Sequence, residues 1–299
     1  MTKFFSMTQF MHKVAQVVEL GDAFEETQDE SFLEAEIAAW QQILPEPILK
    51  QTSPDFQAST YGRAGQSFFN RYHQKQRLED LTMARQLFSK GLQPVTDAAV
   101  HATLLHSLGD VFTNLYRDRA QLKDLEESIA SYRDALAYLD PDDANWCVYL
   151  DDLGTALRDQ YTHTGDLPSL DESIKTHRQV LNVAAVSSSN PSAYFNHLGM
   201  ALLDRYHHIE QLEDLQEAVE SFEQAVQHAP LKSRPGYLSN LGNAFSARSE
   251  HLNEIADLER ALQLHRKAVR LAPTEGLHLH KSRHRPRPLL YSHWTIVCN

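Results

Sequence analysis

Two absences limit what this chain can be: it has few cysteines and no long apolar run. Its 299 residues include only Cys147 and Cys298, which cannot form a disulfide framework and favour a reducing compartment. No apolar stretch approaches the length that spans a bilayer. Residues 1–20 lack the continuous apolar core of a secretory signal; a mitochondrial presequence is an alternative, because the first acidic residue is Glu19. We therefore expect a soluble, cytoplasmic protein.

Positive charge is also scarce. The chain has 28 lysines and arginines against 40 aspartates and glutamates, a formal net charge of −12. Residues 274–299 contribute +3, from four Lys and Arg against Glu275, so residues 1–273 carry −15. An acidic surface repels the phosphate groups of nucleic acids and anionic lipids. We expect neither a nucleic-acid partner nor a membrane.

Motifs for catalysis are missing as well. The sequence contains no P-loop, no HExxH zinc motif and no glycine-rich phosphate-binding loop. Cys147 lacks the flanking residues of a caspase-like nucleophile, and we interpret it as a packed thiol. His177 and His265 are interpreted as core imidazoles bonded to backbone groups, and His207 and His208 as solvated turn residues. The sequence therefore predicts a protein that is not an enzyme and needs no cofactor.

What the chain does have is an internal repeat. The phrase LGDVF at 108–112 recurs as LGTAL, LGMAL and LGNAF, with AGQSF as a weaker copy. A second phrase, LEDL at residue 78, recurs with the same spacing as LKDL, LPSL, LEDL and IADL. Two phrases that share one period indicate a repeat architecture. The repeat glycines are separated by 44, 45, 45 and 43 residues and are Gly65, Gly109, Gly154, Gly199 and Gly242.

Each repeat has the pattern of two helices. Apolar residues stand four and one positions before each repeat glycine and three and seven after it, except at Ser249, and these positions form one face of a helix. Glycine costs about 1 kcal/mol relative to alanine inside a helix, so we infer that a partner helix packs directly against its backbone. In the second helix we expect a ring, four positions after a small residue, to fill this space. The small residues and rings are Ala84 and Phe88, Ser128 and Tyr132, Ser173 and His177, Ala218 and Phe222, and Ala261 and His265.

Polar residues predict where each second helix begins. Asp124 precedes LEESI, and Glu127 follows it three residues later, which is the pattern of a capping box. The other predicted caps are Asp80, Ser169, Asp214 and Asp257.

Together these patterns predict an all-α solenoid of five to six antiparallel helix pairs with a period of about 44 residues. LGDAF places Gly21 one period before Gly65 and suggests an additional, degenerate copy. The predicted division is an N-terminal helix or arm over 1–19, a degenerate first repeat over 20–60, the array over 61–273 and a basic, histidine-rich, disordered tail over 274–299.

The histidines of that tail make only a weak metal site. His278, His280 and His284 supply ligands, but their surroundings are rich in proline and arginine and offer no scaffold to orient them. The next LG phrase would fall near residue 286, where the sequence is RPR. We therefore predict no bound metal and interpret the tail as the place where the repeat pattern breaks off.

The repeat resembles the tetratricopeptide (TPR) repeat, whose pattern is W-x2-L-G-x2-Y, then A-x3-F, then P. One unit fills these positions with Leu105, Leu108, Gly109, Phe112, Ser128 and Tyr132. No unit has the tryptophan, and the period is about ten residues longer than the usual 34. The sequence is most similar to long-period TPR arrays of fungal proteins, which often accompany a caspase-like (CHAT) peptidase or a nucleotide-binding switch domain.

The resemblance implies a concave groove lined by the first helices, where TPR proteins hold peptides. Asparagine amides in it could bind an extended backbone, and the neighbouring aspartates favour a basic partner. The family's version that clamps a C-terminal carboxylate needs several Lys and Arg, and only Arg158 is present. The alternative is that these residues are only the solvated face of the first helices. The groove candidates are Asn70, His106, Asp110, Asn114, Asp151, Arg158, Asp159, Asn196, Asp204 and Asn243.

Two functions remain open at this point. The first is a non-catalytic scaffold that binds an extended peptide or protein segment in the groove. The second is a regulatory or sensor array that acts with a separate CHAT peptidase-like or nucleotide-binding effector, or an accessory protein of a larger complex. A scaffold should end in a polar capping helix, whereas an uncapped array should end on an exposed apolar face that permits self-association.

Overall fold

The chain folds into consecutive α-helices, as predicted. The computed structural model describes residues 2–93, 95–187 and 190–272, and in that part of the chain it contains twelve α-helices, one short 3-10 helix and no strand. None of these helices is long and apolar enough to cross a membrane. The helices are α1 (Thr2–Thr27), α2 (Glu30–Ile43), α3 (Pro54–Lys75), α4 (Leu78–Leu92), α5 (Ala98–Arg119), α6 (Leu122–Leu136), α7 (Trp146–Thr164), α8 (Leu167–Ser187), α9 (Ser192–Ile209), α10 (Leu212–His228), α11 (Arg234–Leu252) and α12 (Ile255–Leu271).

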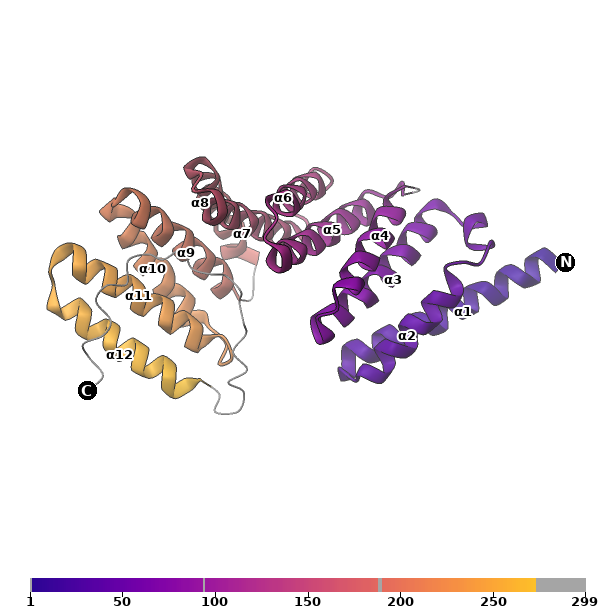
Figure 1. Ribbon diagram of the computed structural model, residues 1–299, viewed down its shortest axis with the longest axis horizontal. Helices are drawn as coiled ribbons and strands as arrows, with labels where there is room; N and C mark the ends of the chain where they lie inside the picture. The colour runs from indigo at the N-terminus through magenta and orange to yellow at the C-terminus, as the bar shows by residue number, and fades with distance from the viewer. Residues whose placement is uncertain (1, 94, 188–189, 273–299) are drawn as a thin grey trace.

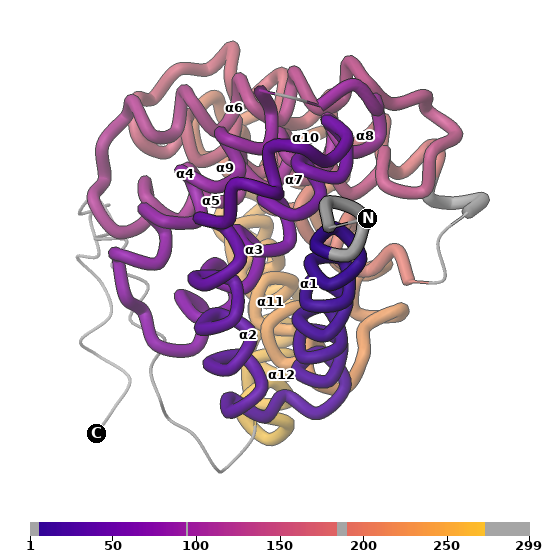
Figure 2. The backbone as a smooth tube through the Cα atoms, turned by 90° about the vertical axis from the view of Figure 1, so that its right-hand side faces the viewer, coloured from indigo at the N-terminus to yellow at the C-terminus, as the bar shows by residue number. Residues whose placement is uncertain are grey.

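The twelve helices form six antiparallel pairs, which stack from one end of an arch to the other (Figure 1). Viewed from the side, the N-terminal pair α1–α2 lies in front of the C-terminal pair α11–α12 (Figure 2). First helices contact one another along the array, α3 with α5, α7 with α9 and α9 with α11, whereas no two second helices of the described residues are in comparable contact. Because elements lie closer together on the inside of a curve, we call α3, α5, α7, α9 and α11 the inner helices.

The repeat glycines pack against rings, as predicted. A Cβ atom at any of the five would lie between 2.4 and 2.8 Å from a ring atom of the paired helix, closer than real Cβ contacts. In the first pair, a Cβ at Gly21 would lie 2.8 Å from the buried carboxylate of Glu36, which also accepts hydrogen bonds from Trp40 and Ser67. The five glycine–ring pairs are Gly65–Phe88, Gly109–Tyr132, Gly154–His177, Gly199–Phe222 and Gly242–His265.

Two of the predicted boundaries fall inside helices. The division between residues 19 and 20 lies within α1, which continues from Thr2 to Thr27. The division at residue 61 lies within α3, which begins at Pro54 because Ser53 caps it by accepting a hydrogen bond from the Phe56 N–H. The predicted tail lies outside the described residues.

The predicted caps of the second helices are wrong. These helices begin two residues before the expected aspartates, so Asp80, Asp124, Asp214 and Asp257 lie inside the first turn, and the residues at the actual cap positions make no capping hydrogen bond. In α8, Asp166 rather than Ser169 accepts from the backbone, at 3.1 Å from the Ser169 N–H.

The buried aspartates instead bind arginines of the paired first helix. In α9–α10, the Arg205 Nε and Nη2 atoms donate to the two Asp214 carboxylate oxygens at 2.8 and 2.5 Å. The same two-point ion pair joins Arg71 to Asp80 and Arg248 to Asp257. Such pairs fix both distance and angle between two helices.

One repeat has the aspartate without the arginine. In α5–α6, the buried Leu115 stands at the arginine position, and the Oδ2 atom of Asp124 is buried without a hydrogen-bond partner among the described residues. Three repeats therefore carry the arginine–aspartate ion pair, whereas in α5–α6 the carboxylate oxygen Oδ2 of Asp124 is buried without a donor within the described ranges.

Removing the arginine from a complete pair should destabilise the fold. We expect Arg205→Leu to lower the free energy of unfolding by about 2–4 kcal/mol, because it leaves the Asp214 carboxylate buried without its cation. Urea denaturation followed by circular dichroism measures the loss. The matched control is Asp124→Asn, which has no arginine to lose and should change stability by less than about 1 kcal/mol. Equal losses in the two variants would contradict this role of the ion pair.

The turn within each pair uses a left-handed residue. The N–H of this residue donates to the carbonyl four positions earlier, which closes the first helix. Only one of the six is glycine: Gln28, Gln76, Ala120, Gly165, Glu210 and Asn253.

Glycine should improve one of these turns. Residues with a side chain lose roughly 1 kcal/mol in the left-handed region, and glycine does not, although it gains more freedom in the unfolded chain. We therefore expect Ala120→Gly to stabilise the protein by about 0.5 kcal/mol and Gly165→Ala to destabilise it by a similar amount. Paired thermal melts of the two variants provide the measurement, and changes of the same sign would contradict the expectation.

Candidate functional site on the inner helices

Polar side chains join consecutive inner helices at equivalent positions. At each of three junctions between repeats, the residue three before one repeat glycine bonds to the residue two before the next. We call these contacts junction pairs, and each is 2.8 Å long: His106 Nε2 with Asp152 Oδ2, Asp151 Oδ2 with His197 Nδ1, and Asn196 Oδ1 with Asn240 Nδ2.

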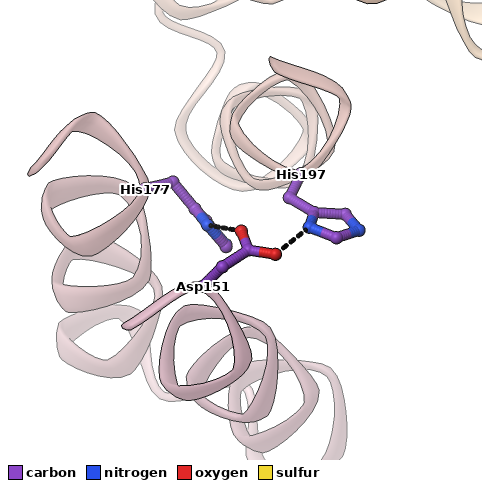
Figure 3. A group of neighbouring side chains, drawn as sticks. All are labelled: Asp151, His177 and His197. Carbon is purple, nitrogen blue, oxygen red and sulfur yellow. Dashed lines mark hydrogen bonds and ion pairs between the residues drawn. The ribbon is translucent and has the colours of Figure 1, made fainter. Parts of the chain in front are cut away.

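The central junction pair has a third member from a second helix (Figure 3). The buried Asp151 of α7 accepts from His177 Nδ1 of α8 at 3.0 Å and from His197 Nδ1 of α9 at 2.8 Å. Burial alone would raise the pKa of Asp151, but the hydrogen bonds from His177 and His197 lower it to about 2. Three helices of two repeats thus meet on one ionised carboxylate.

The pKa values of the two imidazoles around Asp151 are shifted in opposite directions. Burial lowers the pKa of His177, whose side chain is fully enclosed. Burial also acts to lower the pKa of His197, but the hydrogen bond and charge of Asp151 raise it overall. His177 is therefore the neutral partner and His197 the one that more readily carries charge.

Two groups of side chains here could be considered for a metal. Asp151, His177 and His197 place ligand atoms within 4.8 Å of one another, and so does the preceding junction with His106, Asp110 and Asp152. A metal on His177 Nδ1 would require an acceptor for the Nε2–H. The Nε2 atom of His177 is buried and has no hydrogen-bond partner in the part of the chain that the structure describes, which suits an unprotonated nitrogen better than an N–H donor. The geometry therefore fits a hydrogen-bonded junction better than a metal centre.

The junction between α3 and α5 lacks the polar pair. Gly62 and Ser107 stand at the two equivalent positions, and Gly62 has no side chain to reach across. A pocket of about 400 Å³ opens here instead. Its lining is mostly apolar, with polar groups among it: Ala58, Ser59, Gly62, Arg63, Gln66, Phe88, Ala99, Val100, Thr103, Leu104 and Ser107. A cavity of this size and character accommodates a large ligand side chain.

Five of the ten groove candidates bond across junctions between repeats. Arg158 Nε donates to Asp204 Oδ2 at 2.5 Å. His106, Asp151 and Asn196 belong to the junction pairs, and Asp151 and Asn196 are buried.

Of the other five candidates, three form hydrogen bonds within a single repeat. Asn114 donates to the Asp110 carbonyl one turn earlier, and Asn70 accepts from Gln66. The Asp110 carboxylate accepts from the Tyr132 hydroxyl at 2.8 Å, and burial raises its pKa. Asp159 is half-buried and Asn243 is exposed. Whether this face binds a peptide stays a prediction.

Two histidine interpretations require correction. His177 is a core residue, but its partner is the Asp151 carboxylate rather than a backbone group, because the junction brings an acid beside it. His208 lies in the last turn of α9 rather than in a turn between helices, and its Nδ1 atom lies 3.2 Å from the Tyr161 hydroxyl of the preceding inner helix. The same contact recurs one period away on each side, as Tyr116 with His163 and Tyr206 with His251.

The thiol of Cys147 is partly buried, and residues 2–93, 95–187 and 190–272 place no activating group beside it. Burial raises its pKa, and the nearby charge of Asp151 raises it further. Because the thiolate is the reactive form, this environment makes Cys147 a poor nucleophile. The weak metal candidates His278, His280 and His284 lie outside the described residues.

Comparison with known proteins now adds to this geometry. Residues 146–187, which span α7 and α8, match the tetratricopeptide repeat family. The fold is a TPR-like solenoid. No curated protein matches the chain.

Two solved structures illustrate the likeness. One contains the nearly identical TPR-like repeats of a kinesin-light-chain-type protein from Podosopora anserina, at 18% identity and a TM-score of 0.52, and covers 70% of this chain and 96% of that one. The other is BtubC (BKLC) from P. vanneervenii, at 15% identity and a TM-score of 0.52, and covers 80% of this chain and 92% of that one. At this identity the likeness establishes the fold alone. TPR-like folds are generally non-enzymatic protein-interaction scaffolds.

The central junction should weaken in acid. Because the folded-state pKa of Asp151 lies below its ordinary value of 3.8, its stabilisation is present above about pH 4 and is lost as the pH falls toward 2. We expect Asp151→Asn to cost about 2 kcal/mol of unfolding free energy at pH 7, with a smaller difference from the wild type near pH 3. Urea titrations at several pH values measure this. The control is the exposed Asp142→Asn. The assignment would be refuted if the free energies of unfolding of the wild type and Asp151→Asn differed by the same amount at every pH.

Proposed function

We propose that this protein is a non-catalytic scaffold that binds an extended peptide or protein segment along its inner helices, with one side chain anchored in the α3–α5 pocket. The observation that carries the proposal is the missing junction pair at Gly62. Downstream junctions are closed by hydrogen-bonded side chains, whereas this one presents a cavity of about 400 Å³.

The pocket lining suggests the class of ligand. Phe88, Val100 and Leu104 offer contacts to a large apolar side chain, such as leucine, methionine or phenylalanine. Gln66 lies at the pocket and donates to Asn70 one turn along α3. Both amides could bind the backbone on either side of the anchor, because an amide donates and accepts.

Charge favours a basic ligand around that anchor. Residues 1–273 carry a net charge of −15, and a basic segment approaches such a surface faster than an acidic one. The low cysteine content supports a cytoplasmic location for this complex.

Filling the pocket should weaken peptide binding. Peptides are first selected from a random library for binding to the wild-type protein. These peptides should bind Gly62→Met at least about tenfold more weakly, because the new side chain occupies the anchor position. A loss of roughly 1.4 kcal/mol in binding free energy corresponds to that factor. Fluorescence anisotropy with the selected peptides measures the change, and circular dichroism verifies the fold.

The chain offers a matched control. Gly236 lies in the first turn of α11, is exposed, and has open space where a side chain would be added. Gly236→Met should therefore leave peptide affinity unchanged. If Gly62→Met binds the selected peptides as tightly as Gly236→Met, the pocket is not the anchor site.

A further inference from the structure

The second helix of the last pair exposes an apolar stripe. Along α12, Ile255, Leu258, Leu262 and Val269 are 72%, 46%, 49% and 76% exposed. The equivalent residues of α10 include Leu215 and Val219, which pack against the following helix pair and are only 0% and 2% exposed. The same positions are buried in α6 and α8, as Leu125, Ile129, Leu170 and Ile174. The sequence of the stripe is therefore that of a buried packing surface, whereas in this structure the stripe is exposed.

The spacing of the stripe is that of a coiled-coil seam. Residues 255, 258, 262, 265 and 269 alternate by three and four, which are the a and d positions of a heptad repeat. His265 occupies one d position and packs against Gly242 on the other side. Leu262 stands at the middle of the series. A second helix with the same pattern could therefore pack against this face over its full length.

Charges beside the stripe favour one arrangement of two copies. Glu259 and Arg266 occupy successive e positions and are both exposed, and neither forms an ion pair within the described residues. If two α12 helices pack antiparallel, each a position lies opposite a d position, so Leu262 of one copy meets His265 of the other and Leu258 meets Val269. Glu259 then faces Arg266 of the second copy, and the symmetry creates this contact twice.

A parallel arrangement lacks this complementarity. In it, each e position faces the g position five residues earlier in the other helix: Arg266 would face Ala261, which is buried against its own repeat, and Glu259 would face Glu254, a like charge. We propose that the exposed stripe of α12 binds the same stripe of a second copy of this chain in antiparallel orientation, with reciprocal Glu259–Arg266 ion pairs. This dimer surface is separate from the peptide pocket, which lies on α3 and α5.

Self-association of the full chain tests the surface. Sedimentation equilibrium over a concentration series should show a monomer–dimer equilibrium for the wild type, because one helix face from each copy is a small interface. Leu262→Glu should remove the dimer, because it places one carboxylate from each copy inside the apolar interface, next to the symmetry axis. Leu231→Glu is the control: Leu231 is 78% exposed before α11 and is not one of the stripe residues, so its replacement should leave the dimer unchanged.

Charge exchange tests the orientation. Glu259→Arg and Arg266→Glu should each weaken the homodimer at least about tenfold, because like charges then face each other twice. A mixture of the two variants should form a heterodimer of near wild-type strength, and the double variant should again form a homodimer. A parallel dimer would show neither rescue.

Three results would overturn the proposal. The wild-type chain could remain monomeric at all concentrations, and hydrogen exchange protection of α12 in that monomer would assign the stripe to another segment of the same chain. The dimer could survive Leu262→Glu. The mixed charge variants could fail to form a heterodimer while the Leu262 variant still dissociates the dimer, which would exclude the antiparallel register.

Discussion

The whole array depends on one close contact, in which a ring of the second helix lies directly on the backbone of the first. At five repeats a glycine permits this contact, and any larger residue would collide with the ring. The distance between the two helices of a pair is therefore nearly constant from repeat to repeat, although the ring varies between phenylalanine, tyrosine and histidine. Because each pair has the same thickness, the pairs can stack with a regular rotation into an arch.

Upon this constant framework, the contacts between repeats are free to differ. The inner helices meet through hydrogen-bonded side chains at three junctions, and where Gly62 replaces one of these side chains a pocket forms. A single position, three residues before the repeat glycine, thus decides whether a junction is closed or open. The same position that stabilises the array can supply a binding site when its side chain is missing.

The fold was predictable because its signals are periodic, whereas the site depends on exceptions to the period. The glycine spacing and the ring of the second helix identify the helix pairs without any tertiary information. The junction pairs join residues 44 to 46 positions apart, and their register becomes visible only when the repeats are already stacked. The aspartates near the helix starts were mistaken for caps because a cap is a local pattern. Their actual partners, such as Arg205 for Asp214, lie nine residues away on another helix, a spacing that the sequence does contain.

The junction pairs also give the repeats an order. Neighbouring repeats are similar enough in shape that a pair could dock on the wrong neighbour, which is a known hazard of repeat proteins. The polar residues alternate along the array: histidine meets aspartate at one junction, aspartate meets histidine at the next, and asparagine meets asparagine at the third. If the α5 repeat docked directly on α9, His106 would face His197, and Asp151 would lose its partner in the next repeat. The junction pairs therefore favour the correct neighbour of each repeat over the other repeats during folding.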